Sequence, residues 1–490
     1  MGAAWQIIRG GQVLDIDARH VGPADILIAG DTIHEIGAPG LAAPESAVEI
    51  DATDRLVMPG LVNAHTHGHG SLGKGLGDKW SLELLLNAAP WTSGGFTLED
   101  KRLAAQLNAA EMVLKGCTAA YDMYFEFPTA STDGVQAIVE GYRDLGLRVT
   151  LAPMMADITL FRAIPGLLDA LPDPLRHRAE AMATAPSEQH IAVCREILEG
   201  WAFDRDTARP ALGPTIPLHC TDAFLTACRD LAAEHDTGIQ MHLAESKVQA
   251  VAAQTRYGKT LAAHLDSLGI LGPSFTGAHC VWLDDEDLRR MADQGASVAH
   301  NPGSNLRLGS GIARARAMRE HGIPVGIGSD GSGSSDNQNM FEALRLAAFV
   351  SRTQRAQPEE WLGTWEVLDM ATQGGARVLG LEDRIGRIAP DYKADLVFLD
   401  LTHVNYVPLN DAANQIVNCE DSSAVDSVMI GGRMVLQGGA FTDFDFDALR
   451  AKVAESVARL AERNADKHDV AEMMARYVSS HCVGLACHGS

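Results

Sequence analysis

The sequence predicts an α/β protein: a (β/α)₈ TIM barrel with a small β-sandwich domain formed from both chain termini. Three features of the sequence support this prediction. Eight short apolar segments alternate with helix-patterned segments in the middle of the chain, strand-and-turn patterns occupy both ends, and polar residues suited to catalysis follow several of the apolar segments. At 490 residues the chain is also long enough for more than one domain.

Residues 1–58 are predicted to form the first part of the sandwich. They contain the apolar stretches WQIIRGGQVLDI, ADILIAGDTIHEIG and AVEIDATDRLVMPG, which Gly-Gly, Gly-Asp and Asp-Ala-Thr-Asp interrupt. This alternation is typical of strands joined by tight turns. The same pattern returns in residues 384–442, as KADLVFLDLTH and VDSVMIGGRMVLQGG. We therefore expect the two segments to form one small sheet domain.

Residues 59–383 are predicted to form the barrel. The strand candidates, in order, are LVNAHTH, TAAYDMYF, LRVTLAPMM, ALGPTIPLHC, GIQMHLAE, FTGAHCVWL, ASVAHNP and PVGIGSDG. Helix-patterned stretches such as LEDKRLAAQLNAAEMVLKGC and MFEALRLAAFVSRTQ separate them. Residues 158–207 are longer than one crossover needs, so we expect extra helices there, over the barrel mouth.

Residues 443–490 are predicted to form a C-terminal helical segment and a polar tail. The tail carries His481, Cys482, Cys487 and His488, side chains of the kind that ligate metals. Terminal residues are often untethered, so we expect a disordered tail rather than a second metal site.

Composition limits the possible partners and location. The formal charge of −24 argues against nucleic acid and anionic membranes, because both require clustered Lys and Arg. No segment approaches the roughly 18 consecutive apolar residues of a membrane span. The start, MGAAWQIIRGG, does not have the pattern of a signal peptide, and the eight cysteines are scattered, mostly in apolar runs. We therefore expect a cytoplasmic protein with reduced cysteines.

The strongest local signal is Asn63-Ala64-His65-Thr66-His67, directly after Met58-Pro59-Gly60. Residues two apart on a strand point to the same side, so His65 and His67 would project together into the barrel. Imidazole is a common zinc ligand, and two on one strand form half of a site. The pair alone is also compatible with two ordinary strand histidines.

Five further polar residues strengthen the metal-site interpretation. Each lies at or just beyond the carboxyl end of an apolar strand candidate, the end at which barrel enzymes place their active sites. They are His242, Glu245, His279, His300 and Asp330. Any one of them could be an ordinary buried histidine or a helix-capping aspartate. Five such placements together favour a catalytic site.

Several stretches of the sequence carry a resemblance to a known family. They are MPGLVNAHTH, MHLAES, GAHCVWLDDEDL, VAHNPGSNLRLGSGIA and GIGSDGSGSSDNQNMFEALRLAA. With these motifs, and with KADLVFLDL and VMIGGRMVLQGG near its end, the chain resembles the amidohydrolase superfamily over nearly its whole length. The resemblance is to the cytosine deaminase, chlorohydrolase and S-adenosylhomocysteine deaminase branch.

The resemblance implies a role for each polar residue at the predicted site. His65, His67, His242 and Asp330 match positions that bind one divalent ion, with Zn²⁺ favoured and Fe²⁺ the second choice. Glu245 matches the proton shuttle, and His279 matches the histidine that polarises the attacking water, with Asp330 also hydrogen-bonding it. A bound ion would lower the pKa of water from 15.7 toward ~7 and so supply hydroxide at neutral pH.

The expected substrate contacts are less specific. The fourth strand candidate contains no Lys to bridge two metals, so one ion is expected. Its His219 is either a substrate contact or a buried structural histidine. The glycine-rich loop of residues 68–80 is expected to cover the substrate, with Trp80 as an aromatic wall and His300 as a further contact. The residues after His300 (Ser304, Asn305 and Arg307) also match the family pattern, and we expect Asn305 only to shape its loop.

The predicted function is hydrolytic deamination of a nitrogen heterocycle: a purine, a pyrimidine, a pterin or an s-triazine-like ring. Two alternatives remain. The same site could expel chloride, an alkylamine or a sulfide, or hydrolyse a cyclic amide. The fold could also serve as a non-catalytic scaffold, although a scaffold has no need for so many converging polar groups. The resemblance and the apolar C-terminal helices also predict a homodimer or a higher homo-oligomer.

Overall fold

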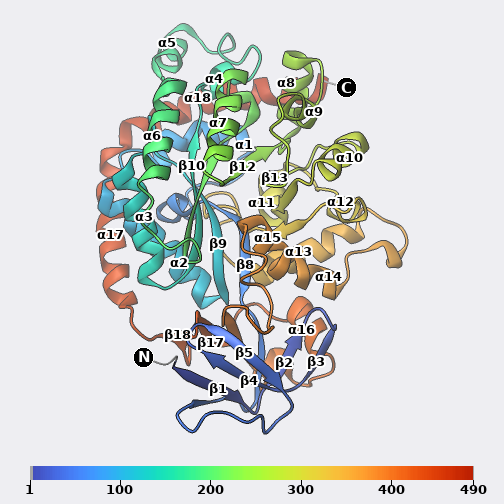
Figure 1. Ribbon diagram of the computed structural model, residues 1–490. Coiled ribbons are helices and arrows are strands. Elements are labelled where there is room, and N and C mark those ends of the chain that lie inside the picture. The colour runs from blue at the N-terminus through green and yellow to red at the C-terminus, as the bar shows by residue number, and fades with distance from the viewer. Residues whose placement is uncertain (1–3, 489–490) are drawn as a thin grey trace.

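A computed structural model describes residues 4–488 and contains three sheets (Figure 1). The central sheet has eight parallel strands that follow one another in chain order. They are β8 (Leu61–Thr66), β9 (Cys117–Tyr124), β10 (Arg148–Met155), β11 (Ala208–Pro214), β12 (Gly238–Leu243), β13 (Phe275–His279), β14 (Ser297–His300) and β15 (Val325–Ile327). This order confirms the predicted (β/α)₈ barrel.

The barrel closes between its last and first strands. The backbone N–H of Asp330, just beyond β15, donates a hydrogen bond of 2.9 Å to the carbonyl of His65 on β8. The Ser329 N–H donates to Oδ1 of Asn63 at 3.0 Å. These bonds place the carboxyl end of β15 beside the carboxyl end of β8, so residues far apart in the sequence meet at one end of the barrel.

Helices surround the barrel and connect its strands. They are α2 (Leu98–Leu114), α3 (Thr132–Asp144), α6 (Ser187–Glu199), α7 (Asp222–Glu234), α8 (Lys247–Tyr257), α9 (Leu261–Ser267), α10 (Asp285–Asp293), α11 (Pro302–Arg307), α12 (Ala315–Glu320), α13 (Met340–Arg352), α14 (Thr364–Asp369) and α15 (Gly375–Leu379), with a π-helical turn at Met370–Gly374. The local sequence determines where several of these helices begin. Thr97 and Asp100 form a capping box at the start of α2, as Asp284 and Asp287 do at the start of α10.

Both termini contribute to a second sheet, as predicted. Its order is β19 (Ala440–Phe441), β18 (Arg433–Gln437), β17 (Val425–Ile430), β16 (Leu396–Asp400), β7 (Arg55–Pro59), β2 (Gln12–Asp15) and β3 (His20–Pro23). The N-terminal β7 pairs antiparallel with the C-terminal β16. α16 (Ala412–Asn418) lies in the connection between β16 and β17.

The remaining N-terminal strands form a separate sheet, which the sequence did not distinguish. Its order is β5 (Thr32–Gly37), β4 (Asp25–Ala29), β1 (Trp5–Arg9) and β6 (Val48–Asp51). Side chains of both terminal sheets share one apolar core, in which Ile26 and Ile28 of β4 pack with Leu396 and Phe398 of β16. The two sheets therefore form the expected sandwich, below the barrel in Figure 1.

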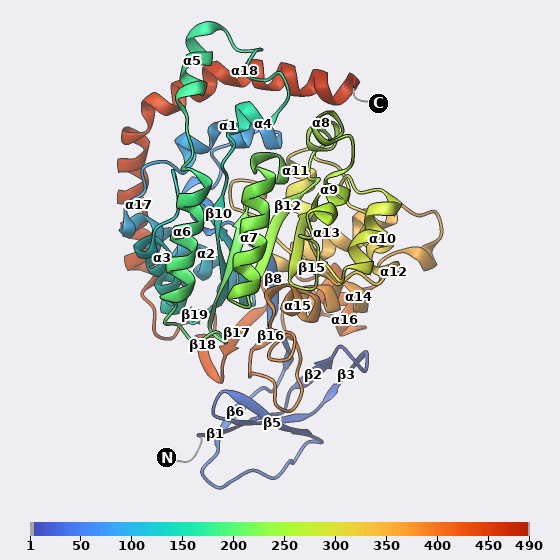
Figure 2. The same cartoon turned by 45° about the horizontal axis from the view of Figure 1, so that its top comes forward.

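The connection from β10 to β11 adds helices, as predicted. α4 (Leu160–Ala163) and α5 (Asp173–Ala181) lie with α1 (Leu82–Thr92) beyond the carboxyl ends of the strands (Figure 2). α6, which ends the same segment, lies instead against α3 and α7 in the outer ring. Only the first half of residues 158–207 therefore extends over the barrel mouth.

The prediction of a disordered C-terminal tail is wrong. α17 (Phe446–Arg463) is followed by α18 (Ala465–His488), which crosses the top of the molecule (Figure 2). Met474, Val478 and Cys482 of α18 are buried against the apolar side chains of the α4–α5 segment. In addition, His481 donates from Nε2 to the Pro165 carbonyl at 2.8 Å. An apolar face that finds a partner surface in the same chain explains the ordered tail.

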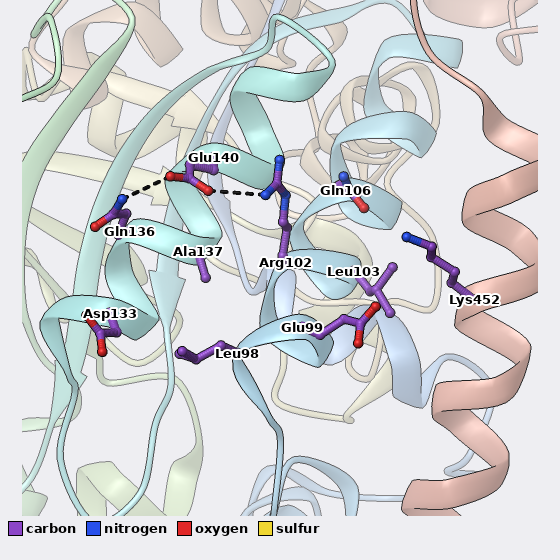
Figure 3. A pocket seen from close by; sticks show the side chains of 10 residues that line it. All are labelled: Leu98, Glu99, Arg102, Leu103, Gln106, Asp133, Gln136, Ala137, Glu140 and Lys452. Carbon is purple, nitrogen blue, oxygen red and sulfur yellow. Dashed lines mark hydrogen bonds and ion pairs between the residues drawn. The ribbon is translucent and has the colours of Figure 1, made fainter.

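A surface groove lies on the outer ring of helices. This groove of about 690 Å³ lies on the outside of the ring between α2, α3 and α17 (Figure 3). Its Arg102 already binds Glu140 and Asp144, and its lining residues come from helices and not from barrel strands. No helix within residues 4–488 is long and apolar enough to cross a membrane.

Candidate metal-dependent active site

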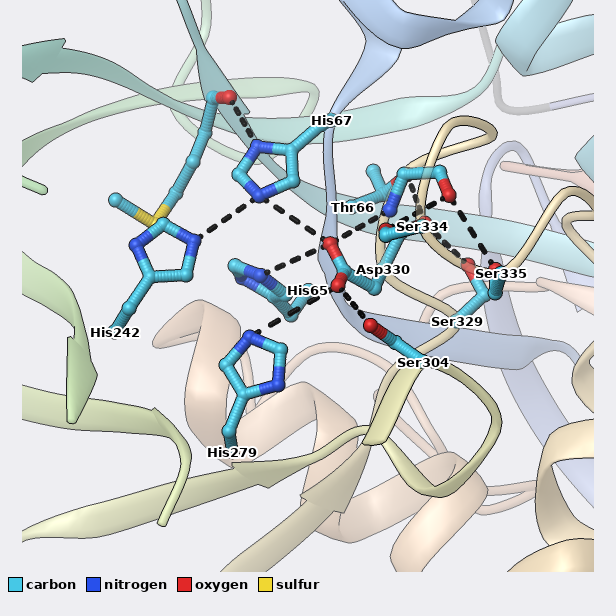
Figure 4. Close-up of polar contacts among 12 residues, drawn as sticks. His65, Thr66, His67, His242, His279, Ser304, Ser329, Asp330, Ser334 and Ser335 are labelled. Carbon is cyan, nitrogen blue, oxygen red and sulfur yellow. Dashed lines mark hydrogen bonds and ion pairs between the residues drawn. The ribbon is translucent and has the colours of Figure 1, made fainter. Parts of the chain in front are cut away.

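Four histidines and Asp330 converge at the carboxyl end of the barrel (Figure 4). His65 and His67 lie on or just after β8, two residues apart, and therefore project together as predicted. His242 lies on β12, His279 ends β13, and Asp330 follows β15. The structure thus brings together all four of the predicted metal ligands and His279.

Each histidine is oriented by an acceptor at its Nδ1 atom. The acceptors are Oε1 of Gln240 for His65 at 2.7 Å, the Met123 carbonyl for His67 at 2.7 Å, the Thr215 carbonyl for His242 at 2.8 Å, and Oδ1 of Asn305 for His279 at 2.9 Å. Gln240 also donates from Nε2 to the Ala64 carbonyl at 3.1 Å, which directs its oxygen toward His65. A neutral imidazole that donates from Nδ1 presents a lone pair at Nε2.

The Nε2 atoms face one another and the carboxylate. The His67 and His242 Nε2 atoms are 3.1 Å apart, and the Nε2 atoms of His65 and His67 are 3.5 and 3.3 Å from Oδ1 of Asp330. Burial lowers the pKa of His67 to about 4 and that of His242 well below its usual range. Two neutral rings would therefore point lone pairs at each other, an arrangement that a cation between them stabilises.

The donor set fits a divalent ion. Ligand atoms of His65, His67 and Asp330 lie within 4.8 Å of one another, and so do those of His65, His242 and His279. His65 is completely buried, and its Nε2 atom has no hydrogen-bond partner within residues 4–488. Nitrogen donors with one carboxylate are the ligands of catalytic zinc sites. The second group also contains His279, so geometry alone does not separate His279 from the ligands.

Asp330 is held as an anion. Although burial opposes ionisation, the close imidazoles of His65, His67 and His279 lower the pKa of Asp330 well below its usual range. The Ser304 hydroxyl donates to its Oδ2 at 2.6 Å, and the Gly331 N–H donates to its Oδ1 at 2.7 Å. Its backbone φ of 61° is strained for a non-glycine residue, and such strain is common at functional sites.

Glu245 is suited to proton transfer. Its Oε2 atom is 3.7 Å from Nε2 of His279, and neither atom has a hydrogen-bond partner in the described part of the chain. Burial, followed by the charges of Asp330 and Glu83, raises the pKa of Glu245 well above its usual range. Burial that disfavours the charged carboxylate strengthens its tendency to take up a proton, as a proton shuttle requires.

Two neighbouring residues on α11 contribute more than the sequence indicated. Ser304 donates to Asp330, and Asn305 accepts from His279. The expectation that Asn305 only shapes its loop is therefore wrong, because α11 turns its side chain toward the barrel. Gln240 was not predicted at all, although its place two residues before His242 on the same strand would have revealed it.

The three expected substrate contacts lie outside the cluster. Trp80 packs edge-on against Trp91, with ring centroids 6.2 Å apart. His219 is buried in the 3₁₀ turn Pro217–His219, and His300 is buried at the end of β14 with no hydrogen-bond partner for either ring nitrogen among residues 4–488. No hydrogen bond or ion pair within these residues joins any of the three to the metal cluster.

His69 is a further neighbour that the sequence reasoning passed over. Its ring centroid is 5.4 Å from that of His67, and its Nδ1 accepts the Phe125 N–H at 3.4 Å. It follows the His65-Thr66-His67 motif in a 3₁₀ turn (Gly68–Gly73). Its spacing of two from His67 was the signal that could have identified it.

Known proteins resemble this chain along most of its length. A model of the amidohydrolase family matches residues 56–435. The 5-methylthioadenosine/S-adenosylhomocysteine deaminase of Syntrophomonas wolfei subsp. wolfei is 33% identical over 425 residues, which cover 85% of this chain and 90% of that protein. The 5'-deoxyadenosine deaminase of Methanosarcina mazei is 31% identical over 461 residues, which cover 93% and 97%.

Solved structures extend the similarity to the fold. A zinc-bound adenosine deaminase from Xanthomonas campestris has a TM-score of 0.82 at 27% identity, covering 93% of this chain and 98% of that one. A variant of the atrazine chlorohydrolase from Arthrobacter aurescens, complexed with zinc and atraton, has a TM-score of 0.83 at 26% identity, covering 92% and 99%. The family match, the relatives and the barrel end described above agree: the chain belongs to the amidohydrolase family.

Proposed function

We propose that this protein is a metal-dependent hydrolase that deaminates an aminated nitrogen heterocycle. The observation that carries the proposal is the convergence of four imidazole rings with Asp330. The Nε2 atoms of His65, His67 and His279 lie 3.3–3.9 Å from its carboxylate, and that of His242 lies 3.1 Å from Nε2 of His67. Each ring also has an acceptor at Nδ1. The deaminase names of the relatives support the choice of reaction. A purine ring of a nucleoside-like compound is the first substrate class to test.

One divalent ion would be held by His65, His67, His242 and Asp330. When bound, such an ion acts as a Lewis acid that lowers the pKa of water and so supplies a nucleophile at neutral pH. Zinc is favoured over iron because the two solved neighbours named above contain zinc. His279 is assigned to the substrate side, because its Nε2 lies toward Glu245.

The protein groups then divide the proton transfers between them. Asp330 and Nε2 of His279 share one O–H of the attacking water as its hydrogen-bond acceptors, and the other O–H points to Glu245. Glu245 takes one water proton on its carboxylate and delivers it to the amino nitrogen of the substrate. A carbon–oxygen bond forms, the carbon–nitrogen bond breaks, and ammonia leaves with its two original hydrogens and the transferred proton. The second water proton stays with the product, whose ring becomes a lactam.

Trp80, His219 and His300 remain proposed substrate contacts. Trp80 lies in the loop after β8, His219 lies after β11, and His300 ends β14, so each is near the carboxyl end of a barrel strand. Loops at this end supply substrate specificity in barrel enzymes. Substitution of a true contact should raise KM more than it changes kcat.

A second candidate keeps the site but changes the leaving group. The similarity to an atrazine chlorohydrolase favours testing chloride release, and alkylamine, sulfide and cyclic amide substrates belong to the same test. A non-catalytic scaffold is disfavoured, because buried polar atoms without partners, such as Oε2 of Glu245, destabilise a fold that does not use them.

The deciding experiment measures metal and turnover on one preparation. Elemental analysis should find about one zinc per chain. A panel of adenosine, 5'-deoxyadenosine, 5'-methylthioadenosine and aminated and chlorinated s-triazines should then give ammonia or chloride. Removal of the ion by a chelator should abolish release, and added zinc should restore it. A metal-free chain that stays metal-free with added zinc would refute the proposal, as would chelator-insensitive turnover.

The assembly state and the cellular location also remain proposals. The apolar face of α18 that suggested a partner is buried within the chain, so the prediction of a homodimer or higher oligomer now depends on the family resemblance. Light scattering over a concentration series tests it, and a mass of one chain throughout would contradict it. A cytoplasmic location is proposed together with the reduced cysteines.

A further inference from the structure

His279 has one orienting partner for its ring. Asn305 Oδ1 is 2.9 Å from Nδ1, and the opposite nitrogen has no hydrogen-bond partner within residues 4–488. We propose that Asn305 is a positioning residue that keeps the proton of His279 on Nδ1, so that Nε2 can accept a hydrogen bond from the attacking water. This inference rests on the proposed function, which gives His279 its task at the water.

The need for such a partner comes from the carboxylates on the other side of the ring. Nε2 of His279 is 3.7 Å from Oε2 of Glu245 and 3.9 Å from Oδ2 of Asp330. The anionic Asp330, and Glu245 when it is ionised, attract a proton to Nε2 at these distances. In that tautomer His279 would donate to the carboxylates and could not accept from water. The Asn305 carbonyl opposes the change by binding the Nδ1–H.

Packing fixes the position of the His279 ring, so only the choice of nitrogen that carries the proton is left open. His279 is completely buried, lies stacked on His242 at 5.5 Å and stands edge-on to His65 at 5.3 Å. Its backbone φ of 69° is in the left-handed region, and the next residue bonds to the Leu243 carbonyl at 3.0 Å. Backbone and neighbours thus determine where the ring lies, but not which nitrogen carries the proton.

The backbone of Asn305 is held in place, whereas its side-chain Nδ2 atom has no hydrogen-bond partner among residues 4–488. Asn305 is buried on α11, its N–H donates to the Asn301 carbonyl at 3.0 Å, and its own carbonyl accepts from Ser310 at 2.8 Å. The preceding residue, Ser304, donates to Asp330. One helical turn therefore orients both the metal-binding carboxylate and the water-binding histidine, and so fixes the position of one relative to the other.

Two substitutions separate positioning from folding. Asn305→Leu removes the acceptor with little change in volume, whereas Asn305→Asp keeps an acceptor at the same place. We expect Asn305→Leu to lower kcat by about 10- to 100-fold, the range found when partners of site histidines are removed. KM and zinc content should stay unchanged, and Asn305→Asp should recover most of kcat. Leu306→Ala, at the exposed next position, is the matched control.

The direct test is the tautomer itself. In zinc-loaded protein with ¹⁵N-labelled histidine, two-bond proton–nitrogen correlations distinguish a protonated Nδ1 from a protonated Nε2, and His279→Asn assigns the signals. The wild type and Asn305→Asp should show His279 protonated at Nδ1, and Asn305→Leu should shift it toward Nε2. This measurement needs no substrate, so it stands even if the proposed deamination fails.

Three results would overturn the inference. One is a wild-type His279 protonated at Nε2, which would mean that Asn305 presents its amide nitrogen to the ring. Another is a tautomer that Asn305→Leu leaves unchanged. The third is an activity of Asn305→Leu that excess zinc restores, which would make Asn305 a support of the metal site instead.

Discussion

Two clusters of buried charge lie at opposite ends of the barrel, and they differ in how completely their atoms are paired. At the carboxyl end, His65, Glu245 and His279 each retain an atom without a hydrogen-bond partner in the described chain. At the amino end, Arg148 begins β10 and pairs with Asp395, the residue just before β16, with side chains only 4% and 2% exposed. The difference in hydrogen bonding distinguishes groups that take part in the proposed reaction from groups that join two domains.

The amino-end pair satisfies its polar atoms. Arg148 donates from Nε and Nη2 to the two oxygens of Asp395 at 2.7 and 3.0 Å, and from Nη1 to the Asp206 carbonyl at 2.7 Å. Asp395 also accepts the Gly431 N–H at 2.7 Å. Burial alone would disfavour the charge, but Asp395 raises the pKa of the Arg148 guanidinium. A fully paired buried ion has no capacity left for a ligand.

The largest effect is expected at Asp330. Asp330→Ala removes the carboxylate that faces His65 and His67, so both the bound metal and the activity should be lost. Elemental analysis and turnover on the same sample measure this. Asp369→Ala, which removes a carboxylate paired with Arg319 on the outer ring, is the control and should retain both. Stoichiometric metal in Asp330→Ala would show that Asp330 is not a ligand.

The next effect is expected at Glu245. Glu245→Gln keeps the shape of the side chain but cannot carry a proton, so turnover should fall by ~10²–10⁴-fold. Metal content should be unchanged, because Glu245 contacts His279 and is not part of either ligand group. If added zinc restored the activity of the variant, Glu245 would be a support of the metal site and not a proton shuttle.

The sequence predicts the barrel well because its signals are local. Apolar strands of the expected length alternate with helices, and polar residues at their carboxyl ends meet once the strands are parallel. A small sheet domain built from both termini was also predictable, since both segments showed strand texture. The separate four-stranded sheet was not, because strand texture does not reveal which strands share a sheet.

The residues that converge at the barrel end were predictable from the sequence, but the residues that orient them were not. His65 and His67 can be identified from the sequence because they are two residues apart on one predicted strand. Asn305 and Ser304 act through a short helix after β14, and only the folded chain shows that this helix faces His279 and Asp330. The order of α18 likewise depends on a surface nearly 300 residues earlier in the sequence, around Leu171 and Leu175.

The amino-end pair should affect stability and leave the chemistry unchanged. Asp395→Ala leaves the Arg148 charge buried without its partner, so the free energy of unfolding should fall by about 3–5 kcal/mol. Zinc content and kcat of the folded fraction should be unchanged. Denaturant melts with metal analysis test this, and Arg195→Ala, which breaks the exposed pair with Glu234, should hardly move the midpoint. Loss of zinc from folded Asp395→Ala would mean that the two ends are coupled.

The smallest effect is expected at Arg307. This residue lies at the carboxyl end of the barrel, but its guanidinium is already paired. Arg307 pairs with Asp336 and donates to the Gly77 carbonyl at 2.5 Å, while Asp336 accepts the Gly75 N–H at 3.2 Å. These contacts fasten the glycine-rich loop after β8 to α11 and to the loop after β15. Both side chains are partly exposed, so solvent screens the pair and its contribution to stability is small.

Arg307→Ala should therefore free the loop without disturbing the cluster beneath it. We expect faster amide hydrogen exchange at residues 74–80 and a KM raised several-fold, because substrate binding must then order the loop. Zinc content and kcat should stay near wild type. Arg307→Lys should give an intermediate KM, since it keeps the charge but cannot reach both partners with one planar fork. A fall in kcat with unchanged amide hydrogen exchange would place Arg307 with the catalytic groups. Complete hydrogen bonding would then no longer distinguish structural from functional charged residues at the carboxyl end of the barrel.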